Sequence, residues 1–123
     1  MVEKRHFSRL PFVAEVRCRA LSGNGGGPLM GSSRNISRNG IGIVLNRRHP
    51  VGTMLNLSFR LPNETKPFRT RGKIAWVDEF TVGPDKAFDT GIEFLDVDEA
   101  KSDAIEQRMF QSASAGSQLR RAG

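Results

Sequence analysis

Several stretches of this chain place an apolar side chain at every second position, and this alternation constrains the fold more than any other feature. In the clearest stretch, Leu55, Leu57, Phe59 and Leu61 alternate with polar or charged residues. A period of two gives a strand one buried side and one solvent-facing side, as in antiparallel sheets. The pattern therefore predicts a mainly β protein.

Turn-forming residues divide these stretches into six short predicted strands. The strands are expected at 12–21, 29–36, 41–45, 55–61, 68–76 and 88–94. Glycine, proline and asparagine are frequent between them, and loops are predicted at 22–28, 46–52, 62–65 and 78–86. Short strands at such intervals favour a small antiparallel barrel.

The spacing of apolar residues changes after residue 94, and one C-terminal helix is predicted. Asp96 with Glu99 resembles an N-terminal capping box. Apolar side chains then follow at helical spacing, namely Ala100, Ala104, Ile105 and Met109. We expect three regions: a flexible basic arm at 1–11, a barrel with its helix at 12–111, and a disordered tail at 112–123.

Positive charge is concentrated near the N-terminus. The chain of 123 residues has a net charge of +6, and residues 1–50 alone carry nine Lys/Arg against two Asp/Glu. Most of the cationic side chains are arginine, whose planar guanidinium binds phosphate and carboxylate in a bidentate manner. This excess predicts an anionic ligand.

Two short clusters lie within this basic region. Arg5 and Arg9 stand four residues apart in the arm, just before the first predicted strand. Asn35, Ser37 and Gly40 occupy a predicted turn between two strands. Guanidinium groups match phosphate oxygens and the acceptor edge of guanine, whereas an amide and a hydroxyl can match its donor edge. Taken alone, each cluster has a simpler interpretation, as solvated arginines or an ordinary β-turn.

In order and spacing, the two clusters resemble the PilZ domain, whose pattern is Arg-x-x-x-Arg followed by Asp/Asn-x-Ser-x-x-Gly. PilZ domains are bacterial receptors for cyclic di-GMP. The resemblance implies a PilZ-like split barrel with a C-terminal helix, which agrees with the fold predicted from the alternation.

The resemblance also implies a role for each residue of the clusters. Arg5 and Arg9 would clamp the ligand. Asn35 and Ser37 would contact a guanine base, and Gly40 would shape the turn. Because the Asn35 amide has one acceptor oxygen where an aspartate has two charged ones, we expect its bond to guanine to be the weaker option.

Three further residues are candidate ligand contacts. Trp76, the only tryptophan, is either a core residue or a surface on which guanine stacks. Lys4 stands where a basic residue accompanies binding of a stacked ligand pair in PilZ domains, so one or two ligands per chain both stay open. Arg38 is a candidate phosphate contact, with a solvated basic surface as the alternative.

Other chemistry has little support in the sequence. His6 and His49 have no cysteine or carboxylate at metal-ligand spacing, so neither a metal nor another cofactor is predicted. Ser37 has no recognisable His/Asp relay, and we expect no enzymatic activity. Cys18, the single cysteine, is expected to be buried and inert. Without an apolar run of membrane-spanning length or a secretory signal, a cytoplasmic protein is expected.

The resulting hypothesis is a non-catalytic cyclic di-GMP receptor that orders its N-terminal arm on binding and signals to an effector protein. One alternative is a PilZ adaptor that acts through protein contacts without a nucleotide. A second is a basic barrel that binds single-stranded nucleic acid. Nucleic acid is the less favoured partner, because a chain without tyrosine offers few aromatic surfaces for base stacking.

Overall fold

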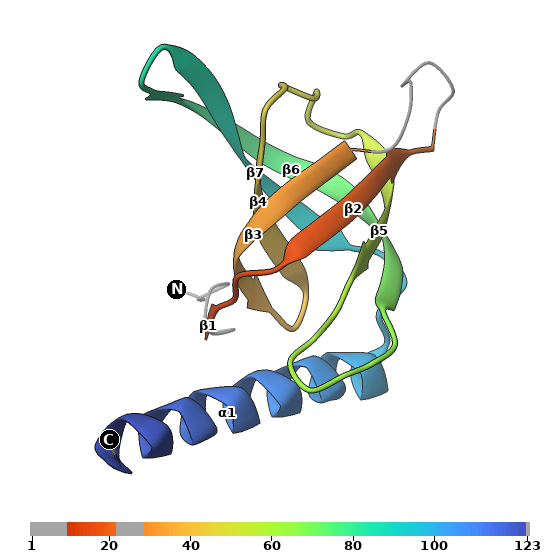
Figure 1. Ribbon diagram of the computed structural model, residues 1–123. Helices are drawn as coiled ribbons and strands as arrows, with labels where there is room; N and C mark the ends of the chain where they lie inside the picture. Colours follow the sequence, from red (N-terminus) through yellow and green to blue (C-terminus); the bar gives the residue numbers. More distant parts are fainter. Residues whose placement is uncertain (1–9, 22–28, 123) are drawn as a thin grey trace, which may run out of the picture.

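The computed structural model describes residues 10–21 and 29–122, with side chains through residue 111 (Figure 1). Its elements are β1 (Leu10–Pro11), β2 (Glu15–Ala20), β3 (Leu29–Ser37), β4 (Gly40–Leu45), β5 (Met54–Phe59), β6 (Phe68–Val82), β7 (Asp85–Phe94) and α1 (Glu99–Ala122). Apart from the two-residue β1, each strand corresponds to a predicted one, and the helix follows the last strand as expected.

Antiparallel pairing joins the described strands into a closed barrel. The sheet order is β1-β3-β2-β5-β6-β7-β4, and β4 also pairs with β3. This second pairing of β3 closes six strands into a ring and leaves β1 beside it as a short additional strand. The predicted fold, a mainly β protein with a six-stranded antiparallel barrel and a C-terminal helix, is confirmed.

Apolar side chains of the alternating pattern fill the interior. Leu55 and Leu57 of β5 are buried, whereas Asn56 between them is exposed. The helix α1 lies across one end of the barrel, where Ile105 and Met109 join the same core (Figure 1). Because burying a leucine side chain contributes about 2 kcal/mol, this interior is the main source of stability.

The hairpin formed by β6 and β7 is longer than the sequence analysis suggested. Residues 78–86, predicted as a loop, continue both strands up to a turn at Gly83 and Pro84. Gly83 takes a left-handed conformation (φ 60°), which suits a tight hairpin turn. Charged residues are not typical of strands, so this part of the sequence did not predict one, although backbone hydrogen bonds alone can pair two strands. The hairpin projects beyond the barrel (Figure 1).

The helix α1 begins differently from the predicted capping box. Its N-cap is Asp98, whose Oδ1 accepts a hydrogen bond of 2.9 Å from the backbone N–H of Lys101. Asp96 instead accepts two side-chain hydrogen bonds from Arg71 of β6, at 2.7 and 2.8 Å. These bonds hold the pKa of the Asp96 carboxyl below its ordinary value. The pair therefore ties β6 to the segment that leads into α1.

The buried side of α1 also differs from the prediction. Ser102, Ile105 and Met109 face the barrel, whereas Ala100 and Ala104 are exposed. The helix continues through residues 112–122, where a disordered tail was expected. That segment lacks proline and contains Ala, Gln, Leu and Arg, which have good helix propensity. Within the described ranges, no helix combines the length and apolar character needed to cross a bilayer.

Cys18 provides a test of the barrel interior. It is 1% exposed in β2, and burial raises the pKa of its thiol to about 12. We expect Ellman's reagent at pH 8 to label the folded protein far more slowly than the protein in guanidinium chloride.

The same burial predicts a dependence of stability on pH. An unfolded thiol ionises near its ordinary pKa of 9.0, whereas the folded one stays protonated to about 12. The contribution of Cys18 is therefore complete below pH 9 and is lost as the pH rises toward 12. Cys18→Ala should lose this part of the alkaline decline in urea titrations, whereas rapid labelling of the folded wild type would contradict the buried position.

Candidate functional site

The hairpin between β3 and β4 carries the second sequence cluster. Asn35 and Ser37 lie at the end of β3, Gly40 begins β4, and a two-residue turn connects the strands. The register pairs Ser37 with Gly40 and Asn35 with Gly42. The structure therefore brings these three predicted residues together within one hairpin.

A row of four residues leads from this hairpin across the outer surface of the barrel. Asn35 pairs with Gly42, Gly42 with Gly91 of β7, and Gly91 with Trp76 of β6. Neighbouring strands lie about 4.8 Å apart, so the path along the curved sheet from Asn35 to Trp76 is about 14 Å. Two predicted site residues thus flank a pair of glycines.

The side chains of Asn35 and Trp76 lie over these two glycines. A Cβ atom at Gly42 would come within 3.0 Å of the Asn35 Oδ1 atom. One at Gly91 would come within 2.2 Å of the indole Cε2 atom of Trp76. The absence of two side chains from the middle of the row therefore lets the amide and the indole lie low on the sheet. Trp76 is still 37% exposed, which leaves part of its ring accessible.

Two β-bulges direct these side chains outward. The register shifts between Ser33 and Asn35 in β3, and again between Ile74 and Trp76 in β6. Ser33 and Ile74 are buried, and residues two positions further would normally face the same way. The extra residue in each bulge reverses the alternation, so Asn35 and Trp76 lie on the outer surface. Of the two alternatives for Trp76, the structure favours the surface position.

Gly42 and Gly91 belong to the candidate site, and the sequence analysis did not identify them. A glycine inside a strand often marks the close approach of another group, and this signal was present in both apolar strands. Arg34 is the extra residue of the first bulge. It forms an ion pair with Asp89 of β7, next to the row.

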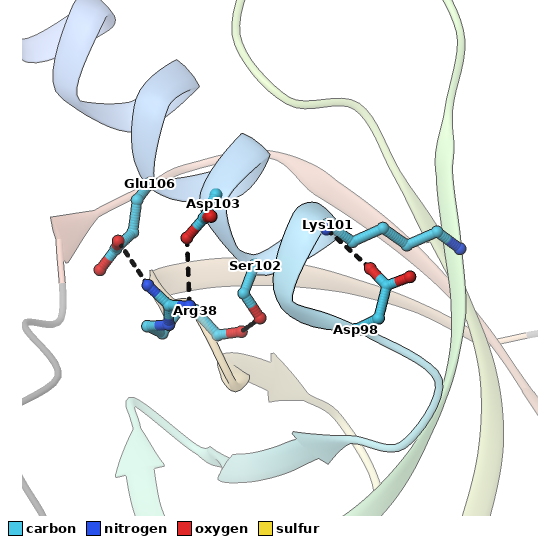
Figure 2. A network of polar contacts seen from close by, with 6 residues as sticks. All are labelled: Arg38, Asp98, Lys101, Ser102, Asp103 and Glu106. Carbon is cyan, nitrogen blue, oxygen red and sulfur yellow. Dashed lines mark hydrogen bonds and ion pairs between the residues drawn. The ribbon is translucent and has the colours of Figure 1, made fainter.

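Arg38 in the turn binds the helix (Figure 2). Its Nη1 donates a hydrogen bond of 2.8 Å to Glu106, and its Nη2 lies 3.1 Å from an oxygen of Asp103. The hydroxyl of Ser102 donates to the backbone oxygen of Arg38 at 2.9 Å. The hairpin turn is therefore fastened to the first half of α1, and Arg38 would have to leave two carboxylates to reach a phosphate.

Ser37 is the least accessible residue of the cluster. Its side chain is 7% exposed, and its hydroxyl donates a 3.2 Å hydrogen bond to the Oδ1 atom of Asn39 within the turn. Together with Leu10 and Ile105 it lines a hollow between the barrel and α1. Because Ser37 is buried and bonded within the turn, its side chain is better placed to stabilise the turn than to contact a ligand at the surface.

The N-terminal segment joins the barrel beside the same hairpin. Leu10 pairs with Ile36 and Pro11 with Asn35, so the last two residues of the predicted arm form β1. This pairing places the start of the described chain next to the row. The sequence analysis, which assigned residues 1–11 to a flexible arm, did not anticipate it.

The remaining candidates, Lys4, Arg5 and Arg9, lie outside the described residues. Arg9 is bonded directly to Leu10, and Arg5 is at most about 18 Å of extended chain away from it. The covalent structure alone therefore keeps both arginines within reach of the Asn35 hairpin.

The arrangement offers binding groups on an open surface. An indole ring and an amide over two adjacent glycines suit a flat, hydrogen-bonding compound such as a base, and the sequence just before Leu10 contains two arginines. Among the residues that the structure describes, no three His, Cys, Asp or Glu side chains are grouped so that they could hold a metal ion.

Comparison with known families identifies the fold. Residues 3–111 match the family model described as the PilZ domain. The chain belongs to the PilZ domain family. The matched range of this PilZ domain includes both sequence clusters and about half of α1. No curated protein matches the chain.

Solved structures show the same PilZ fold. The PilZ domain with c-di-GMP of YcgR from Escherichia coli has a TM-score of 0.72 and 15% identity, covering 96% of this chain and 98% of that one. The inhibitor of motility MotI/DgrA from Bacillus subtilis has a TM-score of 0.71 and 19% identity, covering 93% and 53%. The MrkH-c-di-GMP complex from K. pneumonia has a TM-score of 0.73 and 14% identity, covering 97% and 57%. This PilZ domain thus spans about half the length of the latter two proteins.

The position of Trp76 over Gly91 can be tested by fluorescence, because the chain has a single tryptophan. We expect Gly91→Ala to displace the indole into solvent, since the new Cβ would lie 2.2 Å from it, and to shift its emission to longer wavelength. The circular dichroism spectrum should stay close to that of the wild type. Thr81→Ala, at an exposed position further along β6, is the control; equal spectra for all three proteins would contradict the arrangement.

The attachment of the turn to α1 can be tested by denaturation. Arg38→Ala removes both ion pairs with the helix, and its partners Asp103 and Glu106 are half exposed. We expect the free energy of unfolding in urea to fall by about 1 kcal/mol, as solvent screening keeps such pairs weak. Arg47→Ala, at an exposed loop position, should leave it unchanged. A similar loss in both variants would exclude a specific role for the Arg38 contacts.

Proposed function

We propose that this PilZ domain is a non-catalytic receptor for cyclic di-GMP. The observation that carries the proposal is the entry of the N-terminal arm beside Asn35. Leu10 and Pro11 join β3 at the end of the row that also contains Trp76, and the Arg-x-x-x-Arg segment directly precedes them in the sequence. A ligand with two phosphates and two guanines would find a stacking surface, a hydrogen-bonding amide and two guanidinium groups in one region. The proteins with c-di-GMP bound in the YcgR and MrkH structures share this fold.

Each residue of the proposed site has a chemical role. Arg5 and Arg9 would donate paired hydrogen bonds to phosphate or to the acceptor edge of guanine. The Asn35 amide would accept from the donor edge, and Trp76 would stack on a base. Lys4 would add a further cation near the phosphates.

The hairpin residues would act mainly by holding this surface in place. Gly40 leaves no room for a side chain, because a Cβ there would lie 2.6 Å from the backbone oxygen of Ile92. The hydroxyl of Ser37 holds the turn through Asn39. Arg38, bound to two carboxylates of α1, is assigned to fixing the helix rather than to the phosphates.

Signalling would follow from ordering of residues 1–10 over the barrel. A polar arm that closes on a ligand changes the surface that the domain presents, and a separate effector protein in the cytoplasm would recognise that change. In the adaptor alternative, the domain acts through protein contacts and binds no nucleotide. The nucleic-acid alternative uses the basic surface instead.

Isothermal titration calorimetry with cyclic di-GMP tests the proposal. We expect binding by the wild type and a 5- to 150-fold loss of affinity in Arg9→Ala, since a bidentate arginine contact is worth about 1–3 kcal/mol. Arg47→Ala, which also removes one positive charge, is the matched control and should bind as the wild type does.

The outcomes separate the three candidate functions. Absence of binding heat with wild-type protein would support the adaptor. Salt-dependent binding of oligonucleotides without binding of cyclic di-GMP would support the nucleic-acid alternative. Equal affinity of the Arg9→Ala variant and the wild type would exclude the arm from the site.

A further inference from the structure

A second charged surface lies on the outer side of β2, β5 and β6, away from the row described above. The strand register places Arg17, Ser58 and Arg69 side by side in one row. A second row, two residues along the strands, contains Arg19, Asn56 and Arg71. We call these six residues the arginine face. Two arginines from each outer strand thus border a neutral polar floor on β5.

The arginine face is hollowed. Its six residues line a depression of about 470 Å³. A second depression of about 430 Å³ adjoins it and shares Arg17, Ser58 and Arg69. Together the two depressions form a groove that follows β5 between its arginine borders.

Among the residues that the structure describes, most of the positive charge in this groove has no carboxylate within ion-pair distance. Arg71 is bound by Asp96, but within the described parts of the chain Arg17, Arg19 and Arg69 have no ion pair. Elsewhere the described arginines commonly do have one, as in the pairs of Arg34, Arg38, Arg48 and Arg108. Asp96 and Glu15 are the acidic residues that line the two depressions. The groove therefore favours an anionic occupant.

We propose that the arginine face binds an extended acidic segment of a partner protein, with carboxylates at alternate positions. Side chains two residues apart on a strand are separated by about 7 Å, which is the spacing of the two arginine rows. An extended peptide lying along β5 presents alternate carboxylates at the same interval. Each carboxylate could then accept paired hydrogen bonds from an arginine, and the Asn56 and Ser58 side chains would bind the peptide backbone.

The groove fits a peptide better than a nucleic acid. Single-stranded nucleic acids bind proteins through aromatic side chains on which their bases stack, and the residues lining both depressions include only one aromatic side chain, the buried Phe59. Its width, two strand spacings or about 10 Å between the arginine-bearing strands, suits one extended chain. The acidic segment would belong to the effector protein of the proposed function. The inference rests on signalling to such a protein but not on nucleotide binding.

The test uses two synthetic peptides of identical composition and the 123-residue chain. One peptide alternates five Glu with five Ser, and the other, EESSEESSES, has the same composition but no two Glu two residues apart, so its carboxylates do not recur on one face at the spacing of the rows. Fluorescence anisotropy at moderate salt should show the alternating peptide to bind about tenfold more tightly, because only its carboxylates match the spacing of the rows. The double variant R17Q/R69Q should lose this preference and most of the affinity.

Two controls make the result specific. The variant R47Q/K101Q removes the same charge from exposed positions outside the groove and should bind as the wild type does. Calorimetry should give R17Q/R69Q an unchanged affinity for cyclic di-GMP.

Equal affinity for the two peptides, or equal losses in both double variants, would overturn the inference. So would tighter binding of a ten-nucleotide thymidine strand than of the alternating peptide, which would assign the groove to nucleic acid. A protein that binds cyclic di-GMP but neither peptide would refute the acidic partner and leave the receptor proposal standing.

Discussion

The pairing of β3 with β4 is the interaction on which the rest of this structure depends. It closes the barrel, and it sets Asn35 beside Gly42 at one end of the outer row. The same strand β3 receives β1, so the N-terminal segment must enter next to the hairpin. At the turn, Arg38 and its backbone oxygen bind α1. One hairpin thus joins barrel closure, the proposed ligand site, the arm and the helix.

The outer row shows how irregular strand structure creates a surface site. In a regular strand, Asn35 would share the buried side with Ser33, and Trp76 would share it with Ile74. The two bulges reverse this, at the cost of a local break in each ladder. Glycines between the two side chains then let them lie flat. Both features place polar and aromatic groups on the surface, whereas a regular alternation would have buried them.

Strand alternation was sufficient to predict the barrel, because its apolar residues have to face one common interior. It could not predict the bulges, since an inserted residue leaves no mark in composition. It also missed the outer part of the β6–β7 hairpin, where backbone pairing holds charged residues in strands. The helix start was misplaced because Asp96 and Asp98 are both suitable caps, and only the position of Arg71 decides between them. The arm residues of the proposed site lie outside the described part of the chain, so their role stays a prediction.

The two surfaces differ in how their charge is arranged, and this difference suits two kinds of partner. Next to the outer row, Arg34 is neutralised by Asp89, and Lys73 stands opposite Glu93. An anionic nucleotide placed there would need positive charge from elsewhere, and the arm can supply it. Under the proposed function, binding would require the arm to close, and the ligand would act as a switch rather than a fixed component. The arginine face carries its charge on rigid strands and needs no such closure, as expected of a docking surface that is ready before the signal arrives.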